Sequence, residues 1–378
     1  MMQKRIVIVG GGAFGMDLAW VLEKKADVTL IEQRSHFVHT PAMVSAVLDP
    51  SLLDLALIPY DNALNHGKIV RGRATRIDGS GVDLADGSGL SADFIVVATG
   101  SAYPTPFKAK GDDIDGLRAI NERTHKAVLD AKTIAIVGAG AVGIELAGEI
   151  AYAMPDKKIA IVSSQTTLFP DLPPKFGREL LRKLKEIDVE VILGQKAENL
   201  AHLDMPYAGT LTLSNGRNIK ADLIFPVIGA RANSQILSSL PGVRIGRSNR
   251  VKVDPWLRPS ELPNVFAAGD VVDTGDPMTI SSASRQSHWL KKALLQVTTG
   301  KPVRTLKPYK PWKIAPIGIP LGPKKGNSYI FMTFGDRVTS LLKGRLFLGH
   351  KNKAFGRIVS ERDESSYKYQ KSSLGANK

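Results

Sequence analysis

The sequence predicts an α/β fold with two parallel-sheet domains, followed by a small C-terminal α+β domain. The first observation is a short apolar run, "KRIVIV" at 4–9, that leads directly into the glycine-rich turn "GGGAFG" at 10–15. The second is a repeat of this arrangement, in which "KTIAIV" at 132–137 leads into "GAGAVG" at 138–143. The third is the Pro- and Lys-rich stretch "KPVRTLKPYKPWK" after Gly300, which predicts a linker to a further region.

The first unit has every part of a dinucleotide-binding βαβ motif, in order. Its opening run is β-branched and too short for a helix, which predicts a buried strand. Gly10 permits the tight turn, Gly12 lets a pyrophosphate approach the backbone, and Gly15 lets the next helix pack closely. That helix, "FGMDLAWVLEKKA", directs its N-terminal amides at the phosphates. The next strand, "DVTLIE", ends in Glu32, whose carboxylate suits a ribose 2′-hydroxyl.

The second unit repeats the motif around Gly138, Gly140 and Gly143. Its helix is "AVGIELAGEIAYAM", and its next strand, "KKIAIVSS", ends in Ser163 and Ser164 where the first unit has an acid. The repulsion that would exclude a 2′-phosphate is therefore missing. We expect this unit to accept NADPH as well as NADH, and no arginine follows directly that would select NADPH strongly.

The remaining stretches complete the two units. Residues 68–98 predict short strands joined by two "DGSG" turns, and "FIVVATG" predicts the next buried strand. Later, "PKFGRELLRKLKEI" and "SSASRQSHWLKKALLQVTTG" predict helices, while "VEVILG", "DLIFPVIGARANS" and "NVFAAGDVVD" predict strands. We expect a first domain at 1–105 and 236–301, a second at 106–235, a basic C-terminal domain at 302–360 and a polar, disordered tail at 361–378.

The net charge of +15 is concentrated near the C-terminus. Between Arg285 and Ser360 there are 16 Lys and Arg residues and one acid, Asp336. Such a block predicts an anionic partner: a membrane surface, nucleic acid or an acidic protein. A solvated basic surface would have the same composition. Within this block, "YIFMTF" and "LLKGRLFLGHKNKAFGR" mix apolar and basic residues, which suits a lipid surface, single-stranded nucleic acid or simply a domain core.

The chain also carries signals about compartment. No run of eighteen apolar residues occurs, so no membrane-spanning helix is predicted. Because a strand starts near residue 4 and the second residue is Met2, we expect neither a signal peptide nor an N-terminal myristoylated glycine. We expect a cytoplasmic protein that associates peripherally with an anionic membrane surface. There is no cysteine, which excludes disulfides, thiolate metal sites and a thiol nucleophile, and no metal is expected.

Five motifs in order carry a family resemblance. They are "GGGAFG" with Glu32, "VVATG" at 96–100, "GAGAVGIE" at 138–145, "VIGARAN" at 227–233 and "FAAGD" at 266–270. In these the chain resembles the two-dinucleotide-binding-domain flavoproteins, which include glutathione-reductase-like enzymes, type II NADH dehydrogenases and the apoptosis-inducing-factor group. The resemblance implies two Rossmann-like domains, with FAD in the first and NADH or NADPH in the second. It also implies hydride transfer from the nicotinamide to the flavin.

The absence of cysteine indicates the branch of the family. Disulfide reductases need a cysteine pair beside the flavin, and the peroxidase-like branch needs one cysteine. The matching region, "SHFVHTPAMVSAVLDP", has none, so electrons must leave for a quinone, a redox protein or oxygen. The stretches "GIELAGEI", "IVSSQTTL" and "NVFAAGD" resemble the ferroptosis-suppressor branch. That branch implies an NAD(P)H:quinone oxidoreductase, whose quinol would protect lipids from peroxidation.

Two alternatives stay open at this point. One is a reductase of ferredoxin or rubredoxin type, in which the basic surface docks an acidic protein. The other is a redox-gated binding protein for nucleic acid or partner chains.

The resemblance also assigns site residues. The ADP half of FAD would contact Gly10, Gly12, Gly15, Glu32, Arg34 and Ala74. The flavin end would be flanked by Thr99, Gly100, Gly269, Asp270 and Ser281, the last at the start of a helix aimed at the flavin. The NAD(P)H site would contain Gly138, Gly140, Gly143, Ser163 and Gly229.

Three residues are candidates for catalysis. Glu145 lies on the first helical turn, where it could orient the nicotinamide or handle a proton, or simply be favoured by the helix N-terminus. His39, with His36 beside it, could relay a proton to a quinone or merely bond backbone. Lys343 matches a basic residue near the flavin in the relatives, although a surface lysine fits the position equally.

Overall fold

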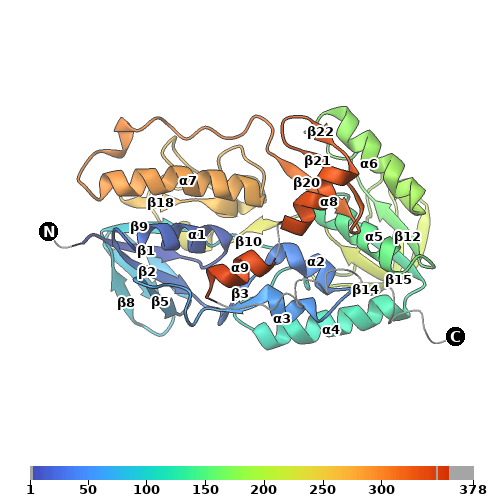
Figure 1. Cartoon of the computed structure of the whole chain (residues 1–378), viewed down its shortest axis with the longest axis horizontal. Coiled ribbons are helices and arrows are strands. Elements are labelled where there is room, and N and C mark those ends of the chain that lie inside the picture. The colour runs from blue at the N-terminus through green and yellow to red at the C-terminus, as the bar shows by residue number, and fades with distance from the viewer. Residues whose placement is uncertain (1–2, 346–347, 357–378) are drawn as a thin grey trace.

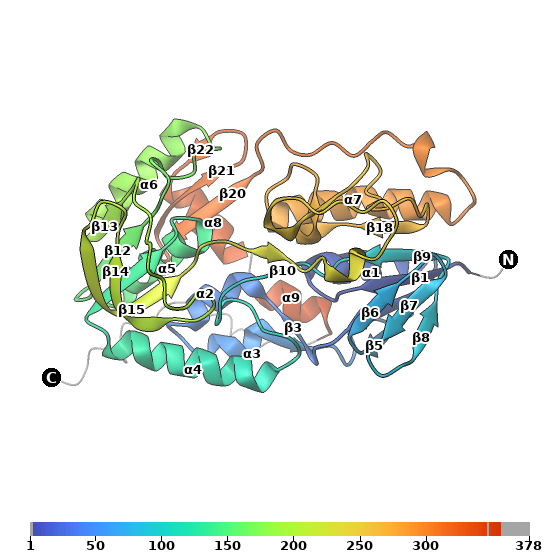
Figure 2. The same cartoon turned by 180° about the vertical axis from the view of Figure 1, so that it is seen from behind.

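Two parallel sheets occupy opposite ends of an elongated molecule (Figure 1). The structure is a computed structural model that describes residues 3–345 and 348–356, without side-chain detail for 342–350. Seen from behind, the short strand β10 (Ser101–Ala102) lies between the two ends (Figure 2). The α/β fold with two Rossmann-like domains that the sequence predicts is confirmed.

The first sheet has the strand order β18-β9-β1-β2-β5, and all its strands are parallel. Alternate residues of β1 point to opposite faces, as strand geometry requires. Ile6 and Ile8 join a core with helices α1 and α7, while Val7 and Val9 join a second core with a small antiparallel sheet. The elements are β1 (Arg5–Val9), α1 (Ala13–Leu22), β2 (Asp27–Glu32), β5 (Lys68–Arg71), β6 (Ala74–Ile77), β7 (Gly81–Leu84), β8 (Gly89–Ser91), β9 (Phe94–Val97), β18 (Val265–Ala267) and α7 (Ile280–Val297).

The second sheet has the order β13-β12-β11-β15-β14, with only β14 antiparallel. Ile134 and Ile136 of β11 face the helices, while Ala135 and Val137 face a smaller core on the β14 side. The elements are α4 (Ile114–Asp130), β11 (Thr133–Val137), α5 (Ala141–Ala153), β12 (Lys158–Val162), α6 (Pro174–Glu186), β13 (Val189–Ile192), β14 (Tyr207–Thr212) and β15 (Asn218–Pro226).

Shorter elements connect these layers. The chain passes between the two domains along β10, which pairs antiparallel with β16 (Arg231–Ala232). A hairpin-like insertion after β2 comprises β3 (His36–Val38), α2 (Met43–Ala46), α3 (Leu52–Ala56) and β4 (Leu57–Pro59). The other short elements are β17 (Val251–Lys252), β19 (Val272–Asp273) and the 3₁₀ turns η1 (Thr40–Ala42), η2 (Gln235–Leu237), η3 (Arg247–Asn249), η4 (Gly269–Val271) and η5 (Val303–Thr305).

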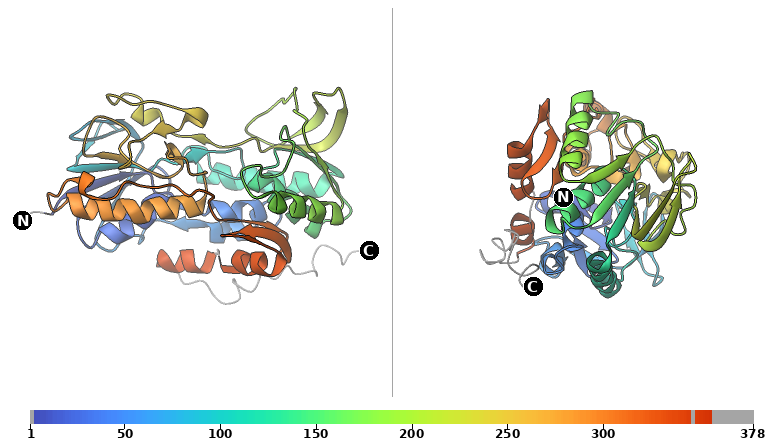
Figure 3. Two further views of the ribbon diagram at one scale, coloured as in Figure 1. Left: turned by 90° about the horizontal axis from the view of Figure 1, so that it is seen from above. Right: turned by 90° about the vertical axis from the view of Figure 1, so that its right-hand side faces the viewer.

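The C-terminal region forms a layer that lies on both domains (Figure 3). Its antiparallel sheet, β20 (Ile317–Leu321), β21 (Lys325–Tyr329) and β22 (Thr333–Phe334), packs with α8 (Asp336–Arg345) against α5 and α6 of the second domain. A Cβ on Gly148 of α5 would lie 2.6 Å from the Cα of Leu321, so the helix touches the strand backbone. Helix α9 (Leu348–Ala354) instead contacts the insertion of the first domain. The tail predicted for 361–378 lies outside the described residues.

Both contacts of this layer have a specific anchor. On the second domain, the buried Lys183 Nζ of α6 donates to the Gly326 carbonyl, Asn327 Oδ1 and the Asp336 carboxylate, each at 2.7 Å. Burial raises the pKa of Asp336, but hydrogen bonds from Lys183 and from the Gly326 N–H outweigh it and hold the pKa below its usual range. On the first domain, the Phe355 ring packs against those of Trp20 and Phe37 at 5.1 and 5.0 Å.

We predict that Lys183→Met loosens the C-terminal layer. The variant removes the donor to three acceptors, two of them buried, and should lower the free energy of unfolding by about 1–3 kcal/mol. Urea unfolding measures this change, and limited proteolysis should cut the segment around β21 and α8 sooner. The matched control is Lys175→Met on the same helix, because the Lys175 side chain is exposed and pairs only with Glu179.

The same anchor predicts a pH dependence. Because the pKa of Asp336 is lowered in the folded state, its contribution is present above about pH 4 and is lost as the pH falls through the folded value. The stability difference between wild type and Lys183→Met should therefore shrink in acid. A constant difference from neutral pH to strong acid would contradict the assigned role of this ion pair.

Candidate functional site

The first glycine turn is shaped by carbonyl oxygens that leave no room for side chains. A Cβ on Gly10, where φ is +110°, would lie 2.4 Å from the Ala98 carbonyl oxygen. A Cβ on Gly15 would lie 1.9 Å from the Gly10 carbonyl oxygen. Gly12, the N-cap of α1, differs, because a Cβ there would meet nothing within 4 Å. Packing therefore requires the first and third glycines, while the second leaves open space in front of the helix N-terminus for a phosphate.

Glu32 is held at the end of β2 by the same turn. Its carboxylate is 5% exposed and accepts hydrogen bonds from the Gly11 N–H at 2.7 Å and the Arg34 N–H at 2.9 Å. The Arg34 guanidinium lies 3.6 Å away, and the Tyr60 hydroxyl donates to the Gly11 carbonyl. Burial, helped by the charge of Glu32, raises the pKa of Tyr60 well above its usual value. The phenol therefore stays protonated and fixes the turn.

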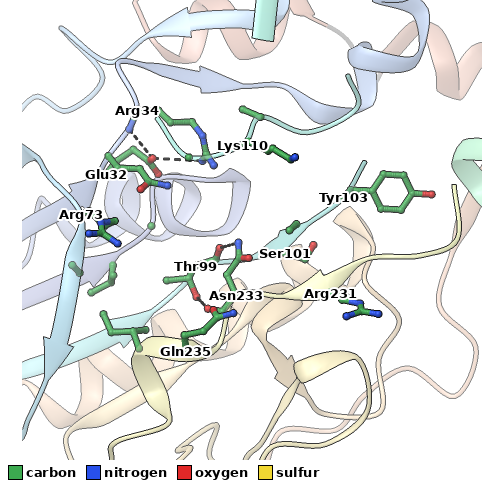
Figure 4. A pocket seen from close by; sticks show the side chains of 18 of the residues that line it. Glu32, Arg34, Arg73, Thr99, Ser101, Tyr103, Lys110, Arg231, Asn233 and Gln235 are labelled. Carbon is green, nitrogen blue, oxygen red and sulfur yellow. Dashed lines mark hydrogen bonds and ion pairs between the residues drawn. The ribbon is translucent and has the colours of Figure 1, made fainter. Parts of the chain in front are cut away.

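A cavity of about 730 Å³ extends from this turn toward the second domain. Four basic side chains from separate segments surround it: Arg34, Arg73, Lys110 and Arg231 (Figure 4). The polar part of the wall also contains two carboxylates, Glu32 and Asp204, the second of which pairs with Lys110. Its neutral polar residues are Gln33, Thr99, Ser101, Tyr103, Asn233 and Gln235, and Ala74 and Gly229 add small surfaces from either domain. A ribose can bond the carboxylate while phosphates meet the bases, so the wall fits a nucleotide.

The two interdomain connections are fastened to each other beside this cavity. The Thr99 hydroxyl donates to the Asn233 carbonyl at 2.6 Å, and the Asn233 amide donates to the Thr99 carbonyl at 3.0 Å. The Asn233 N–H also donates to the carbonyl of Gly100, whose φ is +65°. These bonds join the motifs "VVATG" and "VIGARAN" and fix how one domain faces the other.

Asp270 has partners that sequence analysis did not predict. The Ser101 hydroxyl donates to its carboxylate at 2.7 Å, and Lys108 Nζ lies 3.4 Å away. The neighbouring Gly269, with a φ of +84°, donates its N–H to Gln286 on α7 at 2.7 Å. This bond ties the predicted flavin-end loop to the helix on which Ser281 lies half-buried in the first turn.

A buried carboxylate supports that loop from behind. Asp276 is 1% exposed and accepts from the Tyr309 hydroxyl at 2.6 Å, the Trp312 N–H at 2.8 Å and the Thr274 hydroxyl at 2.9 Å. The amide of Gln286, which also holds Gly269, lies 3.4 Å from the same carboxylate. Burial and the bond to Asp276 raise the pKa of Tyr309, so its hydroxyl stays a donor. The network connects the Lys-rich connector after α7 to the flavin-end loop.

The second glycine turn repeats the geometry of the first. Gly138 has a φ of +120°, and a Cβ there would lie 2.3 Å from the Val227 carbonyl oxygen. A Cβ on Gly143 would lie 2.0 Å from the Gly138 carbonyl oxygen, whereas one on Gly140 would meet nothing within 4 Å. Ser163, directly after β12, is buried, and its hydroxyl accepts from the Gln165 N–H at 3.2 Å. No carboxylate stands at the position that Glu32 occupies in the first unit.

Glu145 lies half-buried on the first turns of α5, close enough to Tyr103 for its charge to act on the phenol. Burial is the larger cause and the Glu145 charge the smaller cause of a raised Tyr103 pKa. The Tyr103 hydroxyl donates to the Val227 carbonyl at 3.2 Å, beside the second glycine turn. Tyr103 also lines the cavity, so Glu145 lies near the cavity wall without being part of it. The place of Tyr103 in a Pro-containing connector gave no signal in the sequence.

His36 and His39 are not among the residues that line the cavity. His39 is 4% exposed, its backbone N–H donates to the Ala56 carbonyl, and its ring lies 6.3 Å from that of Phe37. His36 bonds the Ser35 hydroxyl at 2.8 Å, and burial and Arg118 lower its pKa. Lys343 lies in α8, but its side chain is outside what the structure describes.

The cavity wall thus brings together six of the predicted residues. They are Gly10, Glu32, Arg34, Ala74, Thr99 and Gly229. Within residues 3–345 and 348–356, no group of three or more metal-ligating side chains occurs. In the same described part, no helix has the length and apolar character needed to cross a bilayer.

Comparison with known proteins adds a family and a fold. A model described as pyridine nucleotide-disulphide oxidoreductase matches residues 60–287, and a second model of that description matches residues 5–55. Apoptosis-inducing factor homolog B of Dictyostelium discoideum is 32% identical over 366 residues, which cover 91% of this chain and 94% of the relative. Ferroptosis suppressor protein 1 of Homo sapiens is 26% identical over 316 residues, covering 81% and 83%.

Solved structures agree on the fold. The sulfide:quinone oxidoreductase of Aquifex aeolicus superposes with a TM-score of 0.76 at 15% identity, covering 96% of this chain and 94% of that one. A water-forming NADH oxidase of Lactobacillus brevis, bound to NADH, gives a TM-score of 0.60 at 19% identity, covering 86% and 75%. The resemblance drawn from the five motifs is confirmed by these matches.

We predict that alanine at Gly12 and at Gly140 has different effects, because each substitution disturbs only one of the two nucleotide sites. A Cβ at Gly12 or Gly140 meets no protein atom, so both variants should fold. Gly12→Ala should purify with at least about tenfold less FAD, because the methyl group stands where the pyrophosphate approaches. Gly140→Ala should keep its FAD while the KM for NADH rises about tenfold or more.

The readouts are flavin absorbance per chain, steady-state kinetics and melting temperature. Gly10→Ala serves as the contrasting variant, because its Cβ clashes with the Ala98 carbonyl and should cost stability. Loss of FAD from Gly140→Ala but not from Gly12→Ala would reverse the assignment of the two turns.

A second prediction concerns Ser163. The wild-type protein should use NADH and NADPH with kcat/KM values within about tenfold of each other, because no charge repels the 2′-phosphate. Ser163→Asp should lower kcat/KM for NADPH about tenfold or more while leaving NADH nearly unchanged. Ser163→Ala is the control for loss of the hydroxyl alone. A strong wild-type preference for NADH would refute the prediction.

Proposed function

The chain belongs to the pyridine nucleotide-disulphide oxidoreductase family and is an NAD(P)H-dependent flavin oxidoreductase, and we propose that it reduces a lipophilic quinone. Like the family, it takes FAD as cofactor and NAD(H) as co-substrate. When bound, the flavin supplies hydride acceptance from nicotinamide and two-electron delivery to the acceptor. The two crowded glycine turns fit this pair of dinucleotides.

One observation carries the proposal: a member of a disulphide-reductase family without a single cysteine. No thiol pair can store the electrons inside this chain, so they must pass to an outside acceptor. The insertion that would carry the redox cysteines contains His36, His39 and apolar residues, and many of these are buried. A segment without cysteine at this place would suit a quinone ring better than a peptide or glutathione disulfide.

The chain's own residues would position the two cofactors and supply protons to the quinone. Gln286 and Asp276 hold the Gly269–Asp270 loop, and Thr99 and Asn233 hold the two domains facing each other. Glu145 and Tyr103 would orient the nicotinamide at the second turn. Because quinone reduction consumes protons, His39 would supply one from the insertion, with Lys343 adding positive charge near the flavin. Asp270 and Ser281 would meet the flavin end.

A protein acceptor is the second candidate, favoured by the 16 Lys and Arg residues between Arg285 and Ser360. Such a surface could dock an acidic redox protein. The mixture of large apolar side chains with these bases speaks for the quinone, because a docking face for a soluble acidic protein needs charge more than exposed Phe and Met.

The test is turnover of the FAD-loaded protein with NADH and different acceptors. We predict that a short-chain ubiquinone analogue is reduced faster than oxygen or a ferredoxin. Glu145→Gln should lower kcat about tenfold or more without loss of FAD. The matched control is Glu179→Gln, because Glu179 is also half-buried on a helix of the second domain and pairs with Lys175. Fast reduction of ferredoxin with slow reduction of quinone would favour the second candidate and reject the first.

A further inference from the structure

The turn between β21 and β22 exposes three consecutive large apolar side chains. Ile330, Phe331 and Met332 are 40%, 73% and 54% exposed. Turns that face only water are built mostly from Gly, Pro, Asn, Asp and Ser. Leu341 of α8, at 56%, is the other large exposed apolar residue among the side chains of this layer that the structure describes. We call Ile330, Phe331, Met332 and Leu341 the apolar tip.

Leu341 lies toward the same end of the hairpin as the turn. Asp336 accepts from the Gly326 N–H, and Thr339 bonds Ser328 at 2.8 Å. Helix α8 therefore runs along β21 in the direction of Ile330. The next turn of the helix, which carries Leu341, continues toward the β21–β22 turn.

The tip is an ordered structure. Strands β21 and β22 pair at Ser328 with Phe334 and at Tyr329 with Thr333. The Phe331 ring packs edge-on against the ring of Phe334 at 5.4 Å. At the other end of β21, Lys183 fixes the hairpin to α6. The apolar side chains are therefore held in one place before binding, so binding does not have to order the turn.

The chain segment that leads to the tip carries basic residues and no acids. The connector Lys307–Pro316 enters β20 where Ile317 pairs with Tyr329, so its end lies beside the turn. Of its exposed lysines, Lys313 lies nearest the turn, while Lys307 and Lys310 lie along α7, where their carbonyls accept from Trp289 and Arg285. Between residues 285 and 335 there is no Asp or Glu; of the acids that bound this stretch, Asp276 is buried and Asp336 is paired with Lys183. Trp312 is also exposed on this connector, with the Arg285 guanidinium 4.3 Å from its ring centre.

We propose that the apolar tip inserts into the interfacial region of an anionic lipid surface, where the connector lysines meet the headgroups. Apolar side chains gain from leaving water there, and lysines gain from the negative surface potential. Tryptophan is enriched at the same depth of a membrane. The inference goes beyond quinone reduction, because it concerns binding alone.

Other occupants fit the tip less well. Nucleic acid could bind the lysines and stack on Phe331 or Trp312, but Ile330, Met332 and Leu341 would stay exposed to water. A second copy of this chain, docked through the tip about a two-fold axis, would place two basic connectors opposite each other. An anionic lipid surface satisfies both the apolar and the charged groups.

The test is flotation of the FAD-loaded protein with vesicles of phosphatidylcholine containing about one fifth phosphatidylserine. We expect flotation at low salt, weaker flotation at high salt, and little with phosphatidylcholine alone. The double variant Phe331→Ser, Met332→Ser should lower the partition coefficient about tenfold or more. The matched control, Ile245→Ser, removes a side chain that is 49% exposed elsewhere and should float as the wild type does.

Three results would overturn the proposal: no flotation of the wild type, equal flotation of the tip variant, or a wild-type dimer that the tip variant converts to monomers in sedimentation velocity. The flavin spectrum and turnover with a water-soluble quinone report that the variants are folded. If the wild type floats but reduces no quinone, the proposed function fails and the lipid-binding surface stands.

Discussion

Two carbonyl oxygens that occupy the space of a side chain determine where this protein can hold ligands. At each glycine turn, the third glycine lies so close to the carbonyl of the first that a Cβ would come within 1.9 Å in one domain and 2.0 Å in the other. This crowding presses the helix against the strand and leaves its N-terminal amides open. Because both turns are built alike and Thr99 and Asn233 bond the connectors together, the two nucleotide sites have one fixed relation.

The C-terminal layer also holds the two domains in place, because it contacts both of them. Its hairpin is anchored on α6 by Lys183, and Phe355 packs into the first domain beside Trp20. The connector leading to the hairpin is tied through Asp276 and Gln286 to the Gly269 loop. The connector that leads to the proposed lipid-binding surface and the loop proposed to meet the flavin are therefore joined by hydrogen bonds of Asp276 and Gln286. These bonds hold the connector in a fixed position relative to the Gly269 loop.

Local patterns were enough to predict the strands and helices around both turns, because each is an apolar run next to a glycine motif. They did not predict α4, whose sequence is largely polar and is interrupted by Gly116, or β14, which is an edge strand of small and polar residues. Tyr103, Lys108 and Lys183 also escaped prediction. Their partners Val227, Asp270 and Asp336 are more than a hundred residues away in sequence, and only the tertiary fold brings them together.

The central claim is that the flavin alone stores electrons in this chain, since the chain has no cysteine thiol beside the two dinucleotide sites. An anaerobic reductive titration of the purified, yellow protein measures this directly. The account predicts that two electrons per chain bleach the flavin band completely, that NADH achieves the same, and that no long-wavelength thiolate-to-flavin band appears. Uptake of four electrons per chain, or a protein that neither carries nor rebinds FAD, would contradict it.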